Sequence, residues 1–327
     1  MSEEILPRLL LSQRFTSFEE LAALAVAWDL DFRQISKSNS ASHLEQIQAG
    51  NILFSHLSCG CFATHAGETP KNMCTISLPD AGCPDFRFFG RLIDRPELIV
   101  SPAGQEFNVF TRPGYGISTF SISNTVFDKY CETNFDCPAD KILESGGGVI
   151  PIGPEVTANL RAMARQLSTL ARAPSDLSCQ FNPVHSFESQ VLESLCDSLQ
   201  REEPTRKEPG AAVRNRMLKR ALEFIGDNEN EPLNVRDLSA TVATSERTLR
   251  RLFNREFGVS PKKYLFGHRM YGAHRQLWQS SPSETRIVDV ANVWGFWHMG
   301  QFARDYRGFF GELPSETLNG SSTTRSV

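Results

Sequence analysis

The chain has 327 residues, which is long enough for two domains that each bury a core of their own. With 40% hydrophobic and 22% charged residues, its composition is typical of a soluble globular protein rather than a membrane protein. No run of about 18 apolar residues occurs, and charged residues and a proline interrupt residues 1–11. We therefore expect neither a signal peptide nor a spanning helix, and we expect a cytoplasmic location.

The net charge of −4 conceals an uneven distribution along the chain. Residues 211–327 carry 17 Lys and Arg against 12 Asp and Glu, a net of +5, so residues 1–210 carry a net of −9. A basic C-terminal third attached to an acidic body indicates that the C-terminal third binds a polyanion.

All the cysteines lie in the acidic part of the chain. They are Cys59, Cys61, Cys74, Cys83, Cys131, Cys137, Cys179 and Cys196. Because they form no Cys-x-x-Cys pair, we expect reduced and mostly buried thiols and no metal site. The alternative is that Cys59 and Cys61 sense redox state or hold zinc with Cys74 and Cys83, although this spacing matches no standard zinc pattern.

The N-terminal part is predicted to be mainly β-structure. Residues 17–28 predict a short amphipathic helix, capped by Ser17 with Glu20 three residues on. Short β-type runs separated by turn residues then follow at 51–65, 73–79, 86–94, 97–102 and 115–123. Such regular spacing predicts a closed or sandwiched antiparallel sheet, and a barrel is our preferred interpretation.

Helical periodicity begins after residue 154. In residues 155–171 one stripe contains Val156, Leu160, Met163, Leu167 and Leu170. Residues 187–199 predict a second amphipathic helix, and residues 200–210 have no apolar side chain and two prolines, as linkers do. We therefore predict a domain at 1–200, a linker at 201–213 and a helical domain at 214–320.

The helical domain contains an internal repeat. Residues 237–261, "DLSATVATSERTLRRLFNREFGVSP", correspond to residues 289–314, with most matching positions 53 apart and one residue inserted at the turn. Each copy predicts a short helix, a turn and a longer helix that ends at Phe-Gly, where glycine adopts the left-handed conformation. This order of elements is typical of a helix-turn-helix motif, which we place at about 234–258 and again at about 286–311.

The longer helix of each motif has an apolar face and an opposite face suited to DNA contact. Leu249, Leu252 and Phe253 share the apolar face in the first copy, as Phe302, Tyr306 and Phe309 do in the second. The candidate DNA-binding residues are Arg247, Arg250, Arg251, Asn254, Trp297, Gly300, Gln301 and Arg304. Arginine pairs with guanine, and Asn or Gln with adenine, in the major groove. The alternative is that these positions are merely solvated surface.

The seven aromatic residues within 294–314 fit the same division between core and surface. Trp294 and Phe296 lie at the turn and are expected to hold the two helices together, whereas Trp297 is expected to point outward. Between the motifs, residues 260–282 predict roughly twenty helical residues, which span about 30 Å. This length is close to the ~34 Å helical turn of DNA, so a rigid spacer of this kind can set two recognition helices in successive major grooves.

The segment from Met217 to Leu318 resembles the DNA-binding domain of the AraC/XylS family of bacterial transcriptional regulators. The likeness rests on "RDLSATVATSERTLRRLFNREFGVSPKKYL", "YLFGHRMYGAHRQL" and "IVDVANVWGFWHMGQFARDYRGFFGELPSE", about a third of the chain. It implies two helix-turn-helix motifs joined by a long linker helix, which bind two adjacent major grooves of double-stranded DNA. The whole chain is then expected to be α+β, with an N-terminal cupin-like antiparallel β-barrel with flanking helices and a C-terminal all-α domain.

By the same resemblance, Arg247, Arg250 and Arg251 would read bases in the first motif. The corresponding positions of the second motif are Met299, Gly300, Gln301 and Arg304. The second motif departs from the family pattern, because Trp297, Met299 and Gly300 stand where polar residues are common. Gln301 and Arg304 are therefore its best candidates, and we expect the first motif to carry more of the sequence specificity.

The resemblance also implies a role for residues 1–200 in binding a small-molecule effector and in homodimerisation. The helices at 155–171 and 187–199 could form the dimer surface or pack on the barrel. The resemblance suggests an activator with RNA polymerase as a partner, although the sequence alone does not distinguish an activator from a repressor, and no cofactor is expected. The effector and the residues that bind it do not follow from the sequence.

Two other functions are considered. A cupin-type enzyme would need a His-x-His metal motif, but His43, His56 and His65 are widely spaced, so we expect no enzyme activity. A DNA-binding regulator whose N-terminal domain only dimerises or binds a protein partner remains an alternative. Stabilisation by a small molecule would favour the sensing function over this alternative.

Overall fold

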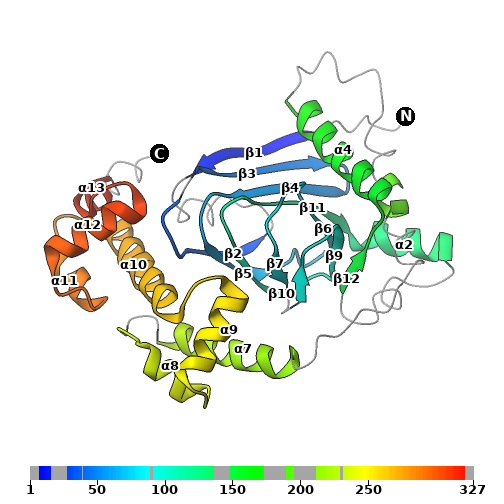
Figure 1. Cartoon of the computed structure of the whole chain (residues 1–327). Coiled ribbons are helices and arrows are strands. Elements are labelled where there is room, and N and C mark those ends of the chain that lie inside the picture. Colours follow the sequence, from blue (N-terminus) through cyan, green and yellow to red (C-terminus); the bar gives the residue numbers. More distant parts are fainter. Residues whose placement is uncertain are drawn as a thin grey trace.

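A computed structural model provides the coordinates of the chain, shown in Figure 1. The structure describes residues 7–15, 28–38, 40–88, 91–135, 148–172, 189–194, 211–228 and 231–320. Antiparallel sheets make up the N-terminal part, and helices make up the C-terminal part, so the fold is α+β as predicted. No helix among the described residues is long and apolar enough to cross a membrane.

The strands of the described residues form two separate antiparallel sheets. The larger sheet contains, in spatial order, β1 (Arg8–Phe15), β3 (Ser42–Ala49), β4 (Ile52–Cys59), β11 (Tyr115–Ser123), β6 (Met73–Pro79), β9 (Glu97–Ser101) and β12 (Gly148–Pro151). The smaller sheet contains β2 (Asp29–Gln34), β5 (Ala63–Glu68), β10 (Glu106–Thr111), β7 (Phe86–Phe88) and β8 (Arg91–Ile93). A barrel needs a continuous ladder around its circumference, and no ladder joins the two sheets within the described ranges. The predicted closed barrel is therefore wrong, and the sandwiched alternative is the one observed.

The outer face of the larger sheet is covered by helices. The helices α2 (Asn124–Phe135) and α4 (Pro154–Leu170) bury Phe127, Leu160 and Leu167 against the sheet. The apolar stripe predicted for residues 155–171 therefore packs on the sheet, where it is used in the core rather than at a dimer surface. Residues 189–194 are also helical and add Val191 and Leu192 to this core. The rest of the predicted 187–199 helix, and residues 17–27 of the predicted 17–28 helix, lie outside the described residues.

Among the described residues of the C-terminal part, seven helices follow. They are α7 (Ala211–Asp227), α8 (Val235–Thr241), α9 (Glu246–Phe257), α10 (Pro261–Gln279), α11 (Ile287–Val293), α12 (Met299–Phe310) and α13 (Pro314–Gly320). Helix α7 begins inside the predicted linker, because residues 211–213 already continue into its helical periodicity; residues 201–210 lie outside the described part. Helix α10 lies between the other helices (Figure 1), and its side chains enter two cores, Tyr264 and Leu265 in one and Met270 and Leu277 in the other.

The helix ends follow the start and stop signals expected from the sequence. The Ser245 hydroxyl accepts a hydrogen bond from the Thr248 backbone N–H at the start of α9, and Ser260 accepts one from Lys263 at the start of α10. Gly258 and Gly311 end α9 and α12 in the left-handed conformation, with φ of 68° and 86°. These local signals explain why both long helices end where the repeat predicted.

Candidate DNA-binding surface

Helix α9 separates a buried face from an exposed basic face. Leu249, Leu252 and Phe253 are at most 5% exposed and pack against α7, α8 and α10. All four candidate residues of this helix, Arg247, Arg250, Arg251 and Asn254, are exposed. The helix therefore presents three guanidinium groups and one amide to solvent, on a backbone that its buried face holds in place.

Helix α12 has the same division but a different exposed face. Phe302 and Tyr306 are buried, whereas the candidates Trp297, Gly300, Gln301 and Arg304 are all exposed, with Trp297 at 69%. The Arg304 guanidinium donates to the Gln301 side-chain oxygen at 2.9 Å and to the Gly300 carbonyl at 3.2 Å. The Gln301 amide in turn donates to Asp305 at 2.6 Å. The two polar candidates of α12 are thus engaged within their own helix.

The core behind α12 contains a buried polar network. The Tyr306 hydroxyl lies 2.5 Å from His274 Nδ1 on α10 and 2.8 Å from the Thr317 hydroxyl on α13. At the preceding turn Trp294 and Phe296 are buried, at 6% and 9% exposure, and the Trp294 indole donates to Gln276 on α10. Phe296 packs against Phe302 of α12, with ring centroids 5.0 Å apart, as expected for a residue that holds the two helices together, whereas the contacts of Trp294 are to α10. Met299 is half-buried against the same core, so it is not fully available to a base.

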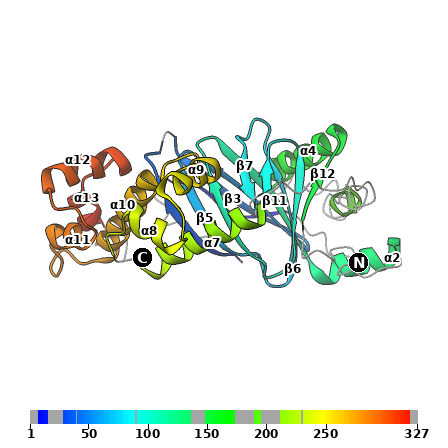
Figure 2. The same ribbon diagram turned by 60° about the horizontal axis from the view of Figure 1, so that its bottom comes forward.

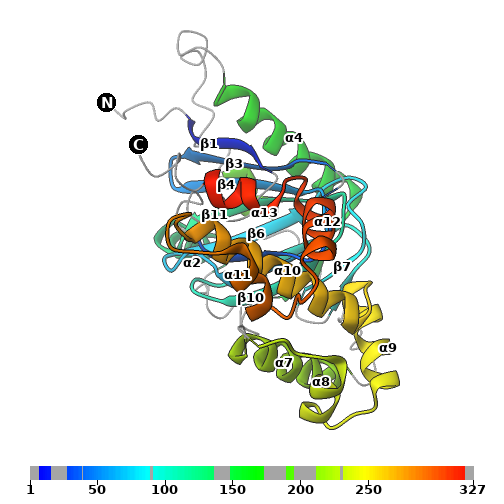
Figure 3. The ribbon, with the colours of Figure 1, turned by 90° about the vertical axis from the view of Figure 1, so that its left-hand side faces the viewer.

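Helices α9 and α12 lie on the same side of the helical part. Figures 2 and 3, which view the molecule from different directions, both place α9 and α12 on one side and α8 and α11 on the other. Helix α10 runs between the two pairs, and its 19 residues span roughly 28 Å at 1.5 Å per residue. The exposed faces of α9 and α12 can therefore approach an extended ligand from the same direction.

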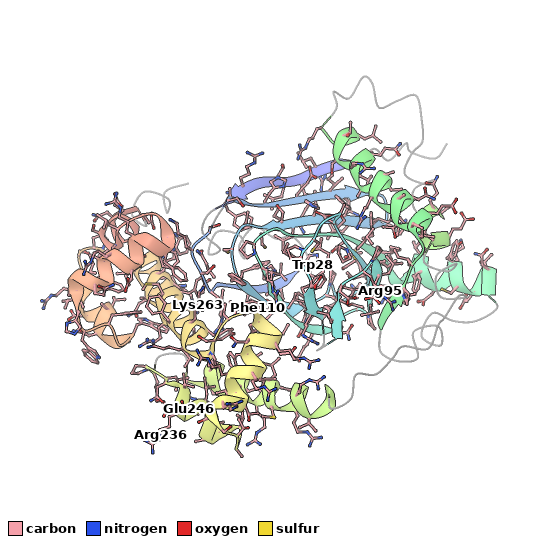
Figure 4. All side chains as sticks on the ribbon, in the orientation of Figure 1. Trp28, Arg95, Phe110, Arg236, Glu246 and Lys263 are labelled. Atoms are coloured by element: carbon pink, nitrogen blue, oxygen red, sulfur yellow. The ribbon has the colours of Figure 1, made fainter. Side chains whose placement is uncertain are left out.

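Contacts that were not predicted from the sequence join α9 and α10 to the sheets. Arg87 on β7 forms an ion pair with Glu256 on α9 at 3.0 Å, with both side chains at most 9% exposed. Phe110 on β10 packs against Phe257, with ring centroids 4.8 Å apart, and Figure 4 shows it at this junction. The Lys263 ammonium lies 5.7 Å from the centroid of the Phe62 ring. Such pairs involve residues distant in sequence, so local periodicity does not reveal them.

A cavity of about 100 Å³ lies between the two sheets. The described residues that line it are Trp28, Leu30, Phe32, Leu44, Gln46, Ser55, Leu57, His65, Thr69, Thr75, Ser77, Phe88, Ile99, Ser101, Phe107, Val109, Tyr115, Ile117 and Thr119. Burial lowers the pKa of His65 to about 3, so this imidazole is neutral at physiological pH. Local sequence motifs do not identify this cavity, because its lining comes from both sheets.

The histidines and cysteines do not converge on a metal site. His43 contacts Ser12, His56 pairs with Asp80 at 2.8 Å, and His65 lies 3.1 Å from the Thr111 hydroxyl. Within the described ranges, no three His, Cys, Asp or Glu side chains are placed to hold a metal ion. Cys59, Cys61, Cys74 and Cys131 are buried cysteines outside any disulfide, and Cys83 is half-buried; burial raises the pKa of Cys61 and of Cys74 to about 12. The remaining cysteines lie outside the described residues.

Comparison with known proteins places the helical part in a family. Residues 238–320 match the family described as "Helix-turn-helix domain". The XylDLEGF operon transcriptional activator of Pseudomonas putida is 32% identical over 130 residues, which cover 40% of this chain and 38% of that protein. A probable thc operon regulatory protein of Rhodococcus erythropolis is 33% identical over 98 residues, 30% of each chain. This chain thus spans well under half the length of these two relatives.

Solved structures give a similar result. A probable AraC family transcriptional regulator from Rhodopseudomonas palustris is 33% identical over 32% of this chain and 97% of its own, with a TM-score of 0.29. The AraC-like transcriptional activator CuxR matches 86% of this chain and 99% of its own at 14% identity, with a TM-score of 0.40.

The matched family identifies residues 238–320 as a helix-turn-helix domain of the kind that these regulators of transcription contain. More particularly, the chain belongs to the AraC/XylS family of bacterial transcriptional regulators.

Proposed function

We propose that this protein is a sequence-specific DNA-binding activator of transcription, in which α9 and α12 read adjacent major grooves of double-stranded DNA. In this proposal residues 214–320 form the DNA-binding domain, with helix-turn-helix motifs at about 234–258 and 286–311 joined by α10. Residues 1–200 form a sensor and dimerisation domain. The protein acts as a regulator rather than as an enzyme, and as an activator it would contact RNA polymerase.

The exposed face of α9 is the observation that carries this proposal. Arg247, Arg250 and Arg251 project from a helix whose opposite face is fully packed, so the helix can enter a groove as a rigid unit. Arginine side chains at such positions can bind phosphates or pair bidentately with guanine. A merely solvated surface helix has no need of three arginines within five residues at its N-terminal half.

The placement of α12 supports a second, weaker contact. It lies on the same side as α9, and the roughly 28 Å length of α10 approaches the ~34 Å helical turn of DNA. Gly300 has no side chain to offer, so Gln301 and Arg304 would make the contacts, with Trp297 beside them against the DNA backbone. We therefore assign most of the specificity to α9.

For the N-terminal part, the cavity between the sheets supports binding of a small-molecule effector. It favours sensing over a domain that only dimerises or binds a protein partner, because a purely structural sandwich fills its interior with side chains. Homodimerisation is proposed through a surface other than the apolar stripe of α4, which is buried against the larger sheet.

The test is selection of bound sequences from a random double-stranded DNA library, followed by titration of the best site at several salt concentrations. We expect a defined pair of half-sites, and an affinity that falls steeply with salt. Changing Arg247, Arg250 and Arg251 together to Ala should abolish specific binding. Arg165→Ala, which removes an exposed arginine of α4, is the matched control and should bind normally. If the triple variant keeps full specific affinity, α9 is not the recognition helix.

A further inference from the structure

The two walls of the cavity between the sheets differ in chemistry. The smaller sheet and the residue before it contribute aromatic and aliphatic side chains, among them Trp28, Phe32, Phe107 and Val109. The larger sheet contributes a row of neutral polar side chains. In the strand register, Gln46 pairs with Ser55, Ser55 with Thr119, and Thr119 with Ser77, so these four residues cross β3, β4, β11 and β6 at one level.

This polar row is buried where a sandwich would ordinarily be apolar. Its four members are between 1% and 8% exposed. The Gln46 amide donates to the Ser55 hydroxyl at 3.2 Å, and the Ser77 and Thr119 hydroxyls lie 3.1 Å apart. A pair of hydroxyls uses one of its two protons in their mutual hydrogen bond, so the second proton can be donated to another acceptor. Buried hydroxyls arranged this way are suited to holding an oxygen atom of a bound molecule.

A second donor lies on the aromatic wall. The Trp28 indole Nε1 is buried and makes no hydrogen bond to a described residue. Its ring packs edge-on against Phe107 with centroids 5.9 Å apart, and Figure 4 shows Trp28 within the sandwich. A buried indole N–H without an acceptor is unfavourable, so an acceptor atom from a bound molecule would stabilise it.

Formal charge is missing from this site. Of the described residues that line the cavity, none is Asp, Glu, Lys or Arg, and the lowered pKa of His65 keeps that side chain neutral. A carboxylate or ammonium group placed here would lose its hydration without gaining a counter-charge, which is strongly unfavourable. The cavity therefore selects against charged ligands.

The volume limits the size of the ligand. The cavity measures about 100 Å³, and an engineered apolar cavity of about 150 Å³ in another protein holds benzene. The cavity is smaller than that one, so a single ring fits only when lining side chains move outward, and a fused polycycle or a long chain would need a larger rearrangement.

We propose that this cavity binds an uncharged, single-ring molecule that carries an acceptor oxygen, with its ring against the aromatic wall and its oxygen toward the Ser77–Thr119 hydroxyls or the Trp28 indole. This inference rests on the proposed function of the cavity as the effector site, and it specifies the chemical class of the effector.

The experiment compares ring compounds that differ in charge, using the full-length chain at pH 7. The probes are benzamide against benzoate and cyclohexanecarboxamide against cyclohexanecarboxylate, measured by calorimetric titration and by thermal unfolding. We expect each amide to raise the unfolding temperature and to bind at least about tenfold more tightly than the matched carboxylate. The proposal would be overturned if the carboxylates bound as tightly as the amides or more tightly. It would also be overturned if none of the four compounds bound.

Variants then locate the contact. Ser77→Ala combined with Thr119→Val removes the hydroxyls with little change of shape and should weaken amide binding about threefold to tenfold, while toluene binding stays unchanged. Ser118→Ala is the matched control, because its hydroxyl contacts Asp80 away from the cavity, and it should leave amide binding unchanged. Equal weakening by Ser118→Ala, or none by the double variant, would contradict the assigned contact. DNA binding is measured on the same unmodified protein, to separate the ligand proposal from the proposed function. Absence of specific DNA binding would refute the proposed function, whereas the ligand result would stand.

Discussion

The C-terminal part contains two helix pairs, α8 with α9 and α11 with α12. Their long helices bury side chains at corresponding positions but differ in the contacts that surround these positions. Leu249 and Phe253 in α9 correspond to Phe302 and Tyr306 in α12, and all four are buried. The next position of this face is Glu256 in α9 and Phe309 in α12. Glu256 reaches Arg87 in the sheet part, whereas Phe309 stays within the local core, although its carbonyl accepts a hydrogen bond from Gln34. The first pair is therefore attached to the sheets by a buried ion pair, and the second by a hydrogen bond to a backbone carbonyl.

The exposed faces of α9 and α12 also differ. Helix α9 begins with a side-chain cap from Ser245 and carries three exposed arginines, whereas the His298 side chain makes no capping hydrogen bond at the start of α12. This difference shows that an internal repeat can keep apolar residues at its core positions while the residues at its surface positions diverge. The three exposed arginines and the buried ion pair to the sheets both lie in the first pair, so a signal from the sheets would reach α9 more directly than α12.

The largest effect is expected from breaking the buried ion pair of the first helix pair. Arg87→Met removes a guanidinium that lies 3.0 Å from the buried Glu256 carboxylate, and Arg255, at 3.6 Å, is a more exposed cationic neighbour. We expect a loss of about 3 kcal/mol in the free energy of unfolding, measured by urea titration. The double variant Arg87→Met with Glu256→Leu should recover most of this loss. A loss below about 1 kcal/mol in the single variant would mean that the pair does not hold α9 to the sheet.

The second helix pair has its own buried polar group, and Tyr306→Phe tests it. Removing the hydroxyl takes a partner from both His274 and Thr317, so we expect a loss of about 1–3 kcal/mol in the free energy of unfolding. Trp297→Ala is the control in the same helix pair and should change stability little, because this side chain is 69% exposed. Full stability of Tyr306→Phe would show that water replaces the hydroxyl.

Much of the helical part could be predicted from the sequence, since its signals are local. The cap at Ser245, the glycines that end α9 and α12, and the buried stripe of each helix all follow from residues within a few turns of each other. The inserted residue also lies at the predicted place, because the turn from Val242 to Ser245 is one residue shorter than the turn from Trp294 to His298. DNA contact by the exposed residues stays a prediction.

For the N-terminal part, the sequence predicted antiparallel β-structure but not the arrangement of the sheets. Whether strands close into a barrel depends on pairing between segments far apart in the chain, which no local pattern determines. The cavity was missed for the same reason, although one signal was present: Thr75 and Ser77 alternate with apolar residues in β6. Alternation of this kind indicates that one face of a strand is polar, but not that this face is buried.

For DNA binding, the comparison of the two helices predicts unequal effects. Arg251→Ala should cost about 1–3 kcal/mol in binding to the selected site and should relax specificity at one base pair. Arg304→Ala should fall at the lower end of this range, because its guanidinium is already held by Gln301 and Gly300. Binding is measured by fluorescence anisotropy on matched and mismatched sites. Equal losses for both variants would contradict the assignment of most of the specificity to α9.

The smallest effect concerns the turns of the two motifs, which adopt the same backbone conformation with different residues. Ala243 has a φ of 51° and Gly295, at the corresponding place, a φ of 74°. A left-handed conformation costs a residue with a Cβ roughly 1–2 kcal/mol, whereas glycine adopts it freely but loses more entropy on folding. Ala243→Gly should therefore stabilise the first motif by about 0.5–1 kcal/mol.

The reciprocal change, Gly295→Ala, should have the opposite sign in the same urea titration. Its new Cβ would lie 2.7 Å from Pro232 Cβ, so steric overlap adds to the cost of the conformation. If Ala243→Gly destabilises the protein instead, the entropy that glycine adds to the unfolded chain outweighs the strain that is relieved at residue 243. The left-handed conformation would then cost little at this turn, although it is occupied by alanine.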